Sequence, residues 1–99
     1  MEEKNIEYTI YYTKIADNQL ILYNWIEKNL KPIKRIEYSF SSIFLTDIAK
    51  RHLGDWVTHE DFKQAMIRCG FWADTSFCNK NCTNWYFNVS VRSMGRIIR

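Results

Sequence analysis

The stretch from Leu53 to Phe71, LGDWVTHEDFKQAMIRCGF, carries the start and stop signals of a short helix. Thr58, followed three residues later by Asp61, resembles a capping box with Asp in place of the usual Glu or Gln. Val57, just before this cap, and Phe62, inside the helix, have the spacing of a hydrophobic staple. These signals predict that a helix begins directly after Thr58.

The same helix has one apolar face and a clear end. Gly70 can adopt the left-handed conformation that ends a helix, and Phe71 after it can fold back onto the last turn. Apolar residues at the spacing i, i+3, i+4 and i+7 are Phe62, Ala65, Met66 and Cys69. We therefore expect a helix over residues 59–69 with these side chains in the core.

A second helix is predicted just upstream, from Ser41 to Leu53, because Ser41 or Ser42 offers an N-cap. Its expected inward face consists of Phe44, Leu45, Ile48 and His52. Gly54 and Asp55 then form a tight turn between the two helices. Helix, turn and helix, followed by a β-hairpin, is the element order of a winged helix-turn-helix.

The expected hairpin follows the helix over residues 59–69. Its clearest strand is residues 84–91, in which apolar and polar side chains alternate. One side of this strand carries Trp85, Phe87, Val89 and Val91, and the other carries Asn84, Tyr86, Asn88 and Ser90. Residues 71–74 form the other strand of this wing, and the polar residues 75–83 form its tip.

The first part of the chain adds one helix and two strands to this prediction. The helix is expected from Asp17 or Asn18 to about Leu30, with Pro32 ending it. Its apolar residues occupy more than one face of the helix. We therefore expect this helix either to pack between other elements of the fold or to contact another molecule. Residues 34–40 predict a short strand, with Ile36, Tyr38 and Phe40 on one side. Residues 6–13 predict an N-terminal strand, with a helical extension as the alternative.

Composition limits the class of protein. A chain of 99 residues with 46% hydrophobic and 16% aromatic residues is expected to form one domain with an ample core. No apolar run approaches the roughly 20 residues of a membrane span, and the first residues, MEEKNIEY, do not match a secretory signal. Three cysteines without such a signal indicate reduced thiols in the cytoplasm.

The segments LYNWIEKNL, SSIFLTDIAKRHLG, VTHEDFKQAMIRCGF and NWYFNVS, in this order, resemble small winged-helix domains of bacterial phages and other mobile elements. Similar modules occur at the C-terminus of phage- and plasmid-type primase-helicases. The resemblance covers about residues 18–91 and implies an α+β fold, a winged helix-turn-helix with three helices and a small antiparallel sheet. Some phage proteins of this size, including some anti-CRISPRs and other inhibitors of host enzymes, use such scaffolds.

With this fold, the chain divides into an N-terminal extension with a β-strand (residues 1–16), a winged-helix domain (17–92) and a basic C-terminal tail (93–99). The tail contributes to a mild net charge of +3 and can favour polyanions, although a merely solvated tail explains it equally well.

If the helix over residues 59–69 turns its apolar face inward, its outer face becomes the candidate binding surface. Gln64, Lys63 and Arg68 suit contacts with base edges and phosphates in a major groove, and His59 could reach a phosphate. The Glu60 carboxylate would be repelled by the phosphates of DNA. The exposed side chain of Ile67 could contact either a thymine methyl group or a protein partner. An ordinary solvated helix face is the alternative interpretation.

The wing and the tail provide a second candidate set. Lys80 at the wing tip is expected to contact backbone phosphate, and Tyr86 could stack on a base or pack on a partner. Arg92, Arg96 and Arg99 add positive charge at the C-terminal end, and Lys50 and Arg51 add it on the second helix. A role in solubility alone would explain the presence of Lys80 at the loop tip equally well.

Metal binding and catalysis have weak support in the sequence. Cys78 and Cys82 form one short-spaced pair, whereas structural zinc usually takes two pairs. We expect these cysteines to face each other across the hairpin and to stay reduced inside the cell. No glycine-rich phosphate loop is present, and no spacing defines a catalytic pair. We therefore expect no metal, no cofactor and no enzymatic activity.

Two functional classes stay open at this point. The first is binding of nucleic acid, most simply duplex DNA, by a regulator or replication accessory of a mobile element. The second is binding of a nucleic-acid-processing protein, by an inhibitor such as an anti-CRISPR or by an accessory subunit. A homodimer is compatible with either class, and both would act in the cytoplasm without a membrane.

Overall fold

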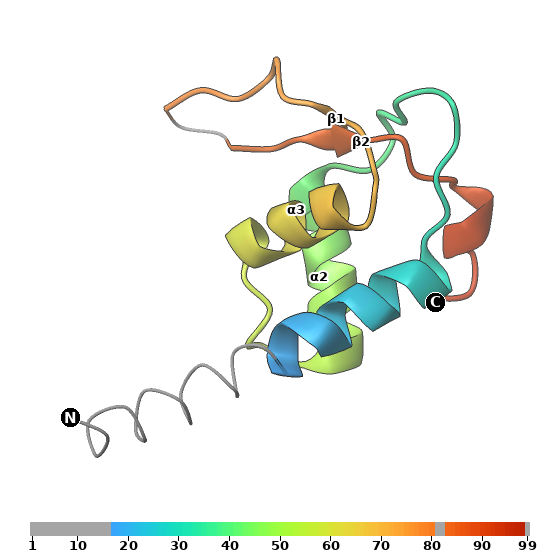
Figure 1. Cartoon of the computed structure of the whole chain (residues 1–99). Helices are drawn as coiled ribbons and strands as arrows, with labels where there is room; N and C mark the ends of the chain where they lie inside the picture. The colour runs from blue at the N-terminus through green and yellow to red at the C-terminus, as the bar shows by residue number, and fades with distance from the viewer. Residues whose placement is uncertain (1–16, 81–82, 99) are drawn as a thin grey trace.

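The computed structural model describes residues 17–80 and 83–98, and Figure 1 shows their arrangement. Three helices and a two-stranded antiparallel sheet make up the described part, which confirms the expected α+β class. The first helix covers residues 17–29. The other elements are α2 (Ser42–Leu53), α3 (His59–Arg68), β1 (Ala73–Asp74), β2 (Tyr86–Phe87) and a 3-10 helix, η1 (Arg92–Met94). The predicted strand over residues 6–13 lies outside the described residues.

Helices α2 and α3 begin where their capping residues predict. The Ser41 side chain accepts a hydrogen bond from the Phe44 backbone N–H, and the Thr58 side chain accepts one from Asp61. Each cap satisfies a first-turn donor that has no partner within the helix. Between the helices, Gly54 has a φ of 130°, a conformation that residues with a Cβ rarely adopt.

The end of α3 is a Schellman motif. Gly70 has a φ of 92° and donates its backbone N–H to the Ile67 carbonyl at 3.0 Å. Phe71 donates to the Met66 carbonyl at 3.1 Å, and its side chain is buried. Both bonds satisfy carbonyl groups of the last turn, as this motif requires. The predicted stop signal at Gly70 is therefore confirmed.

The core lies between the three helices and the inner face of the hairpin. Phe62, Met66 and Val57 have no exposed surface, and Ala65 is 1% exposed, which confirms the predicted orientation of α3. Cys69 is only partly buried. In α2, Leu45 and Ile48 are buried as expected, but His52 is exposed. Its ring lies against Trp25 with a centroid distance of 5.6 Å, at the edge of the core.

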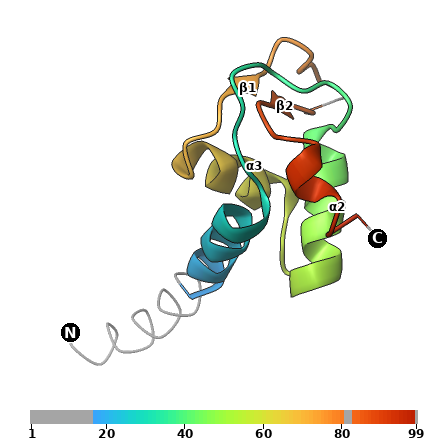
Figure 2. The same cartoon turned by 90° about the vertical axis from the view of Figure 1, so that its right-hand side faces the viewer.

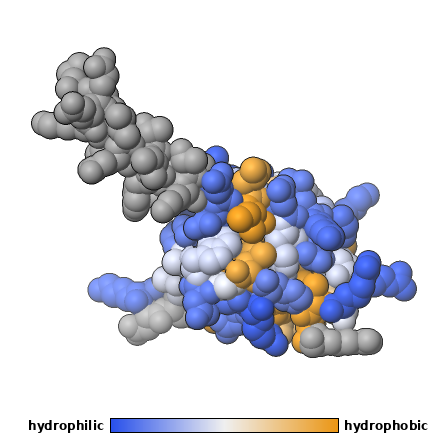
Figure 3. All heavy atoms as spheres, turned by 90° about the horizontal axis from the view of Figure 1, so that it is seen from below, coloured by the Kyte–Doolittle hydropathy of each residue, from blue (hydrophilic) through white to orange (hydrophobic). Residues whose placement is uncertain are grey.

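The helix of residues 17–29 packs one face on the core and is not sandwiched. Leu22, Trp25 and Ile26 are buried, whereas Leu20 and Ile21 are 56% and 47% exposed. Figure 3, which views the molecule from below, shows apolar groups as a narrow band between hydrophilic side chains. Within residues 17–80 and 83–98, no helix combines the length and the apolar character that crossing a membrane requires.

The sheet is shorter than predicted. Strand β1 pairs with β2 through Ala73 with Phe87 and Asp74 with Tyr86, while the prediction extended over residues 71–74 and 84–91. Phe87 and Val89 face the core as expected, but Val91 is 41% exposed because the chain there turns into η1.

The predicted strand over residues 34–40 is wrong, because this segment is irregular. It crosses beside β2 between two isolated bridges, Pro32 with Val89 and Ser41 with Tyr86. The two bridges are nine residues apart along residues 32–41 but only three apart along residues 86–89. A regular ladder needs equal spacing on both strands and therefore cannot form here. Between them, Glu37 donates its backbone N–H to the Phe87 carbonyl at 2.9 Å. We call residues 31–41 the crossing segment.

The C-terminal residues are part of the core and do not form the expected tail. Met94 has no exposed surface and Ile97 is 6% exposed. The His52 ring, on α2, lies with Nε2 at 3.1 Å from the Ile97 carbonyl oxygen. Figure 2 shows η1 beside α2. Residues 93–98 therefore belong to the folded domain.

Candidate binding surface

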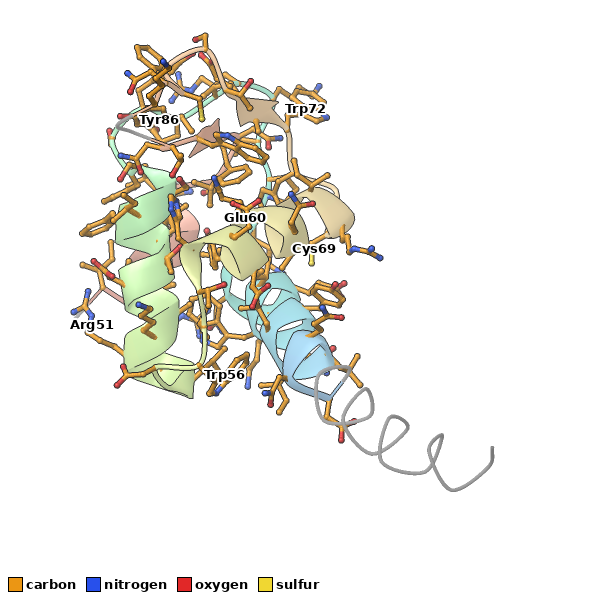
Figure 4. All side chains as sticks on the ribbon, turned by 90° about the vertical axis from the view of Figure 1, so that its left-hand side faces the viewer. Arg51, Trp56, Glu60, Cys69, Trp72 and Tyr86 are labelled. Atoms are coloured by element: carbon orange, nitrogen blue, oxygen red, sulfur yellow. The ribbon has the colours of Figure 1, made fainter. Side chains whose placement is uncertain are left out.

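The outer face of α3 carries acidic, neutral and basic groups. Glu60, Gln64 and Arg68 are exposed, and Ile67 is 43% exposed. These are the positions that the helical periodicity placed outward. Glu60 lies on the face of the molecule turned to the viewer in Figure 4. With exposed Asp61 beside Glu60, the first turn presents two carboxylates, which a phosphate backbone would repel.

Lys63, expected to flank this outer face, is instead 3% exposed. Its ammonium donates to the Thr83 backbone oxygen at 3.0 Å and lies 3.2 Å from the Glu60 carboxylate. It also lies 4.7 Å from the centroid of the Trp85 ring. The hairpin strand that returns over α3 covers this position, and helical periodicity within α3 contains no information about that strand. The ammonium of Lys63 is thus directed at protein groups and not at a phosphate.

His59 has a similar inward role. Its Nε2 lies 2.7 Å from the Ser42 hydroxyl oxygen, which also accepts the Trp85 backbone N–H at 2.8 Å. Partial burial, and then the charge of Lys63, lower the pKa of His59 below its ordinary value of 6.5. The ring is therefore mostly neutral at pH 7, and it shares a hydrogen bond with the hydroxyl of fully buried Ser42. His59 joins α3 to α2 and the hairpin.

A cluster of aromatic rings lies on the hairpin and the crossing segment. Tyr38, Phe77 and Tyr86 contact one another, with ring centroids 6.0 Å apart for Tyr38 and Phe77 and 5.4 Å apart for the other two pairs. The Tyr38 hydroxyl donates to the Asp74 carboxylate, which raises the pKa of Tyr38 and keeps the phenol protonated. Tyr38 and Phe77 are 53% and 54% exposed.

Trp72 is a further exposed aromatic side chain of the hairpin and lies just before β1. Side chains alternate along a strand, so Trp72 shares the outer face of the sheet with Asp74, while Ala73 faces the core beside Phe87. Trp72 is 58% exposed. Figure 4 shows Trp72 and Tyr86 at the same end of the molecule. We call Tyr38, Trp72, Phe77 and Tyr86 together the aromatic hairpin surface.

Three exposed cations flank the aromatic hairpin surface in the sequence. Lys34 and Arg35 belong to the crossing segment that carries Tyr38, and Lys80 lies three residues after Phe77 in the hairpin loop. Two carboxylates, Glu37 and Asp74, lie in the same segments. The Ser39 side chain donates to Glu37 and that of Ser76 donates to Asp74, and these bonds lower the pKa of each carboxyl group. Both groups are therefore charged at pH 7.

The predicted site residues do not form one surface. Gln64, Ile67 and Arg68 lie on α3, whereas Lys80 and Tyr86 lie on the hairpin. Arg92 and Arg96 are exposed but belong to the C-terminal segment, and η1 lies behind α2 in the view of Figure 4 that faces Glu60.

Sequence reasoning missed three members of the aromatic hairpin surface. Tyr38 was placed on one side of a predicted strand with Ile36 and Phe40, Trp72 in a wing strand and Phe77 in the wing tip, and none of the three was given a binding role. The usable signal was Phe77, a large apolar residue inside the otherwise polar stretch 75–83. A loop residue of this kind must either find core contacts or remain in water, and here more than half of its surface is exposed.

The cysteines provide no metal site in the described part of the chain. Cys78 is exposed, and its Sγ accepts a hydrogen bond from the Trp85 ring N–H at 3.1 Å. Cys82, its expected partner across the hairpin, lies outside the described residues. Among residues 17–80 and 83–98, no group of three or more His, Cys, Asp or Glu side chains has the arrangement that a metal ion requires.

Comparison with known proteins gives no relative for this chain. No protein-family model, no curated protein and no solved structure matches it.

Proposed function

We propose that this chain is a small winged-helix-type module that binds nucleic acid through the hairpin and the crossing segment, with α3 as a structural support. The order of helix, α2, turn, α3 and hairpin supports the winged-helix part of the proposal. Its biological setting would be that of a regulator or replication accessory of a mobile element. The proposed location is the cytoplasm, which the cysteine content favours.

The observation that carries the proposal is the contrast between two surfaces. On α3, Lys63 is buried beside Glu60, and the first turn has a second carboxylate. In the crossing segment and the hairpin, Lys34, Arg35 and Lys80 are exposed, and the same two segments carry the exposed rings of Tyr38, Trp72 and Phe77. Lysine and arginine bind phosphates, and aromatic rings bind base faces, so the second surface has the chemistry that nucleic acid requires.

The test is a titration of fluorescently labelled nucleic acid, followed by anisotropy, with two charge-reversal variants. Lys34→Glu combined with Arg35→Glu is expected to weaken binding at least about tenfold and to reduce the salt slope by roughly two phosphate contacts. The matched control is Arg68→Glu on α3, which should change affinity less than about threefold. A large loss with Arg68→Glu and none with the crossing-segment variant would place binding on α3 and overturn the proposal.

Protein binding is the second candidate, because Tyr38, Trp72 and Phe77 are each more than half exposed. Aromatic residues of this kind are enriched where proteins bind one another. An inhibitor or accessory subunit of a nucleic-acid enzyme would then use the same surface. Salt separates the two candidates, since phosphate-driven binding weakens by orders of magnitude between about 50 and 200 mM salt and an apolar interface barely responds.

A further inference from the structure

We infer that the nucleic acid bound at this surface is single-stranded, with bases stacking on Tyr38, Trp72 and Phe77 of the aromatic hairpin surface. This inference rests on the proposed function and specifies its ligand.

The rings of the aromatic hairpin surface meet partly edge to face. Phe77 contacts Tyr38 and Tyr86 with interplanar angles of 73° and 75°, so these pairs are edge-to-face. In such a pair, the ring that presents its edge keeps both of its faces clear of its partner. The half-buried pair Phe40 and Phe44 differs, because its rings stack at 15° and cover each other's faces. Tyr38 and Phe77, which are each more than half exposed, therefore offer ring surface to a base, whereas Phe40 and Phe44 each have one face covered by the other ring.

Positive charge prevails in the segments that carry the rings. Lys34, Arg35 and Lys80 outnumber the carboxylates of Glu37 and Asp74 in the two segments that carry the rings. A single strand can follow these cations with its phosphates while its bases turn toward the rings. Both carboxylates already accept hydrogen bonds within the protein, Glu37 from Ser39 and Asp74 from Ser76 and Tyr38.

A duplex does not offer the free base faces that these rings could bind. In a duplex, both faces of each interior base are stacked on neighbouring bases, so exposed rings gain nothing from them. A winged helix that reads duplex DNA inserts a helix into the major groove. Here that helix would be α3, whose first turn carries Glu60 and Asp61 and whose Lys63 is buried.

The experiment compares labelled oligo(dT) of about 15 nucleotides with a duplex of the same length, using the full chain at about 50 and 200 mM salt. Single-strand binding is expected to be at least about tenfold tighter. Phe77→Ala and Trp72→Ala should each weaken it about tenfold. Ile43→Ala, which removes an apolar side chain that is 44% exposed on α2, is the matched control and should have no effect. Circular dichroism confirms that each variant is folded.

Three results would overturn the inference. If the duplex binds as tightly as the single strand and binding depends on Lys34 and Arg35, the single-strand inference fails while the proposed function stands. If oligo(dT) binds but Phe77→Ala and Trp72→Ala leave its affinity unchanged, stacking on these rings is wrong. If neither nucleic acid binds at about 50 mM salt, the proposed function fails as well, and a protein partner is favoured.

Discussion

Lys63 illustrates how a charged residue becomes a structural one at the scale of a single side chain. Its stem is buried between α3 and the hairpin, and its ammonium reaches Glu60 and the backbone oxygen of Thr83. The bond from Lys63 is also the main cause of the lowered pKa of Glu60. The Glu60 side chain is 69% exposed, so the ion pair itself adds little stability, whereas a carboxylate at the buried position 63 would be costly.

We therefore predict that Lys63→Glu destabilises the fold by about 2–4 kcal/mol, because it places a second carboxylate beside Glu60 and removes the donor to Thr83. Urea denaturation measures this change in the free energy of unfolding. Arg68→Glu, on the exposed part of the same helix, should stay within about 0.5 kcal/mol of the parent protein. Equal stability of both variants would show that Lys63 is solvated.

At the scale of elements, the bond between His59 and Ser42 connects α3 to α2, and the partial burial of the His59 ring makes stability depend on pH. The folded protein lowers the pKa of His59 from 6.5, mainly by burial, so the unfolded chain binds the proton more tightly. The unfolded state then holds more protons below about pH 6.5, and the free energy of unfolding falls as pH falls through the folded pKa. Above about pH 6.5 the contribution is complete.

This predicts that the urea midpoint decreases between about pH 7.5 and 5.5, where histidine is the titrating side chain. His59→Gln should flatten that decrease, whereas His52→Gln should preserve it. The chain has two histidines, so these variants cover both. A pH dependence that disappears with His52→Gln and persists with His59→Gln would contradict the assignment.

Asn88 holds the hairpin to the crossing segment. Its side-chain oxygen accepts the Trp72 backbone N–H at 2.6 Å, and its side-chain nitrogen donates to the Ile33 carbonyl at 2.7 Å. Asn88→Ala removes the hydrogen-bond partner of both backbone groups. Because Asn88 is only 2% exposed, we expect the free energy of unfolding to fall by about 2–4 kcal/mol. Asn24→Ala, at an exposed helix position, is the control and should cost less than about 1 kcal/mol. Similar urea midpoints for the two variants would contradict this role.

The difference between local and distant contacts explains which elements sequence reasoning could predict. Helices α2 and α3 were predictable because Ser41, Thr58 and Gly70 act on neighbours within a few residues. The crossing segment was not, because its path is set by bonds to residues about 50 positions away, such as the one from Asn88 to Ile33. The same limit applied to the candidate site, since the burial of Lys63 depends on the hairpin strand at Thr83 and Trp85.

At the scale of the whole molecule, the C-terminal segment closes the fold. Met94 and Ile97 are buried in the same core as Phe62, and the Ser93 hydroxyl accepts the Lys31 backbone N–H at 3.2 Å. The end of the chain thus contacts both the crossing segment and α2. Arg92 and Arg96 are carried by this packed segment, so their positions are tied to the core and cannot adapt to a ligand as a free tail would.

We predict that deleting residues 93–99 strongly destabilises the domain, beyond any effect on binding. Full burial of Met94 and Ile97 contributes about 1.5–3 kcal/mol each, and a small domain has only about 5–15 kcal/mol in total. The truncated chain should therefore unfold at a clearly lower urea concentration. Arg92→Ala with Arg96→Ala removes the charges and keeps the apolar contacts, so it should shift the free energy of unfolding by less than about 1 kcal/mol. If the truncated chain instead matched this double variant, the segment would be a dispensable tail and its arginines would be free to follow a polyanion.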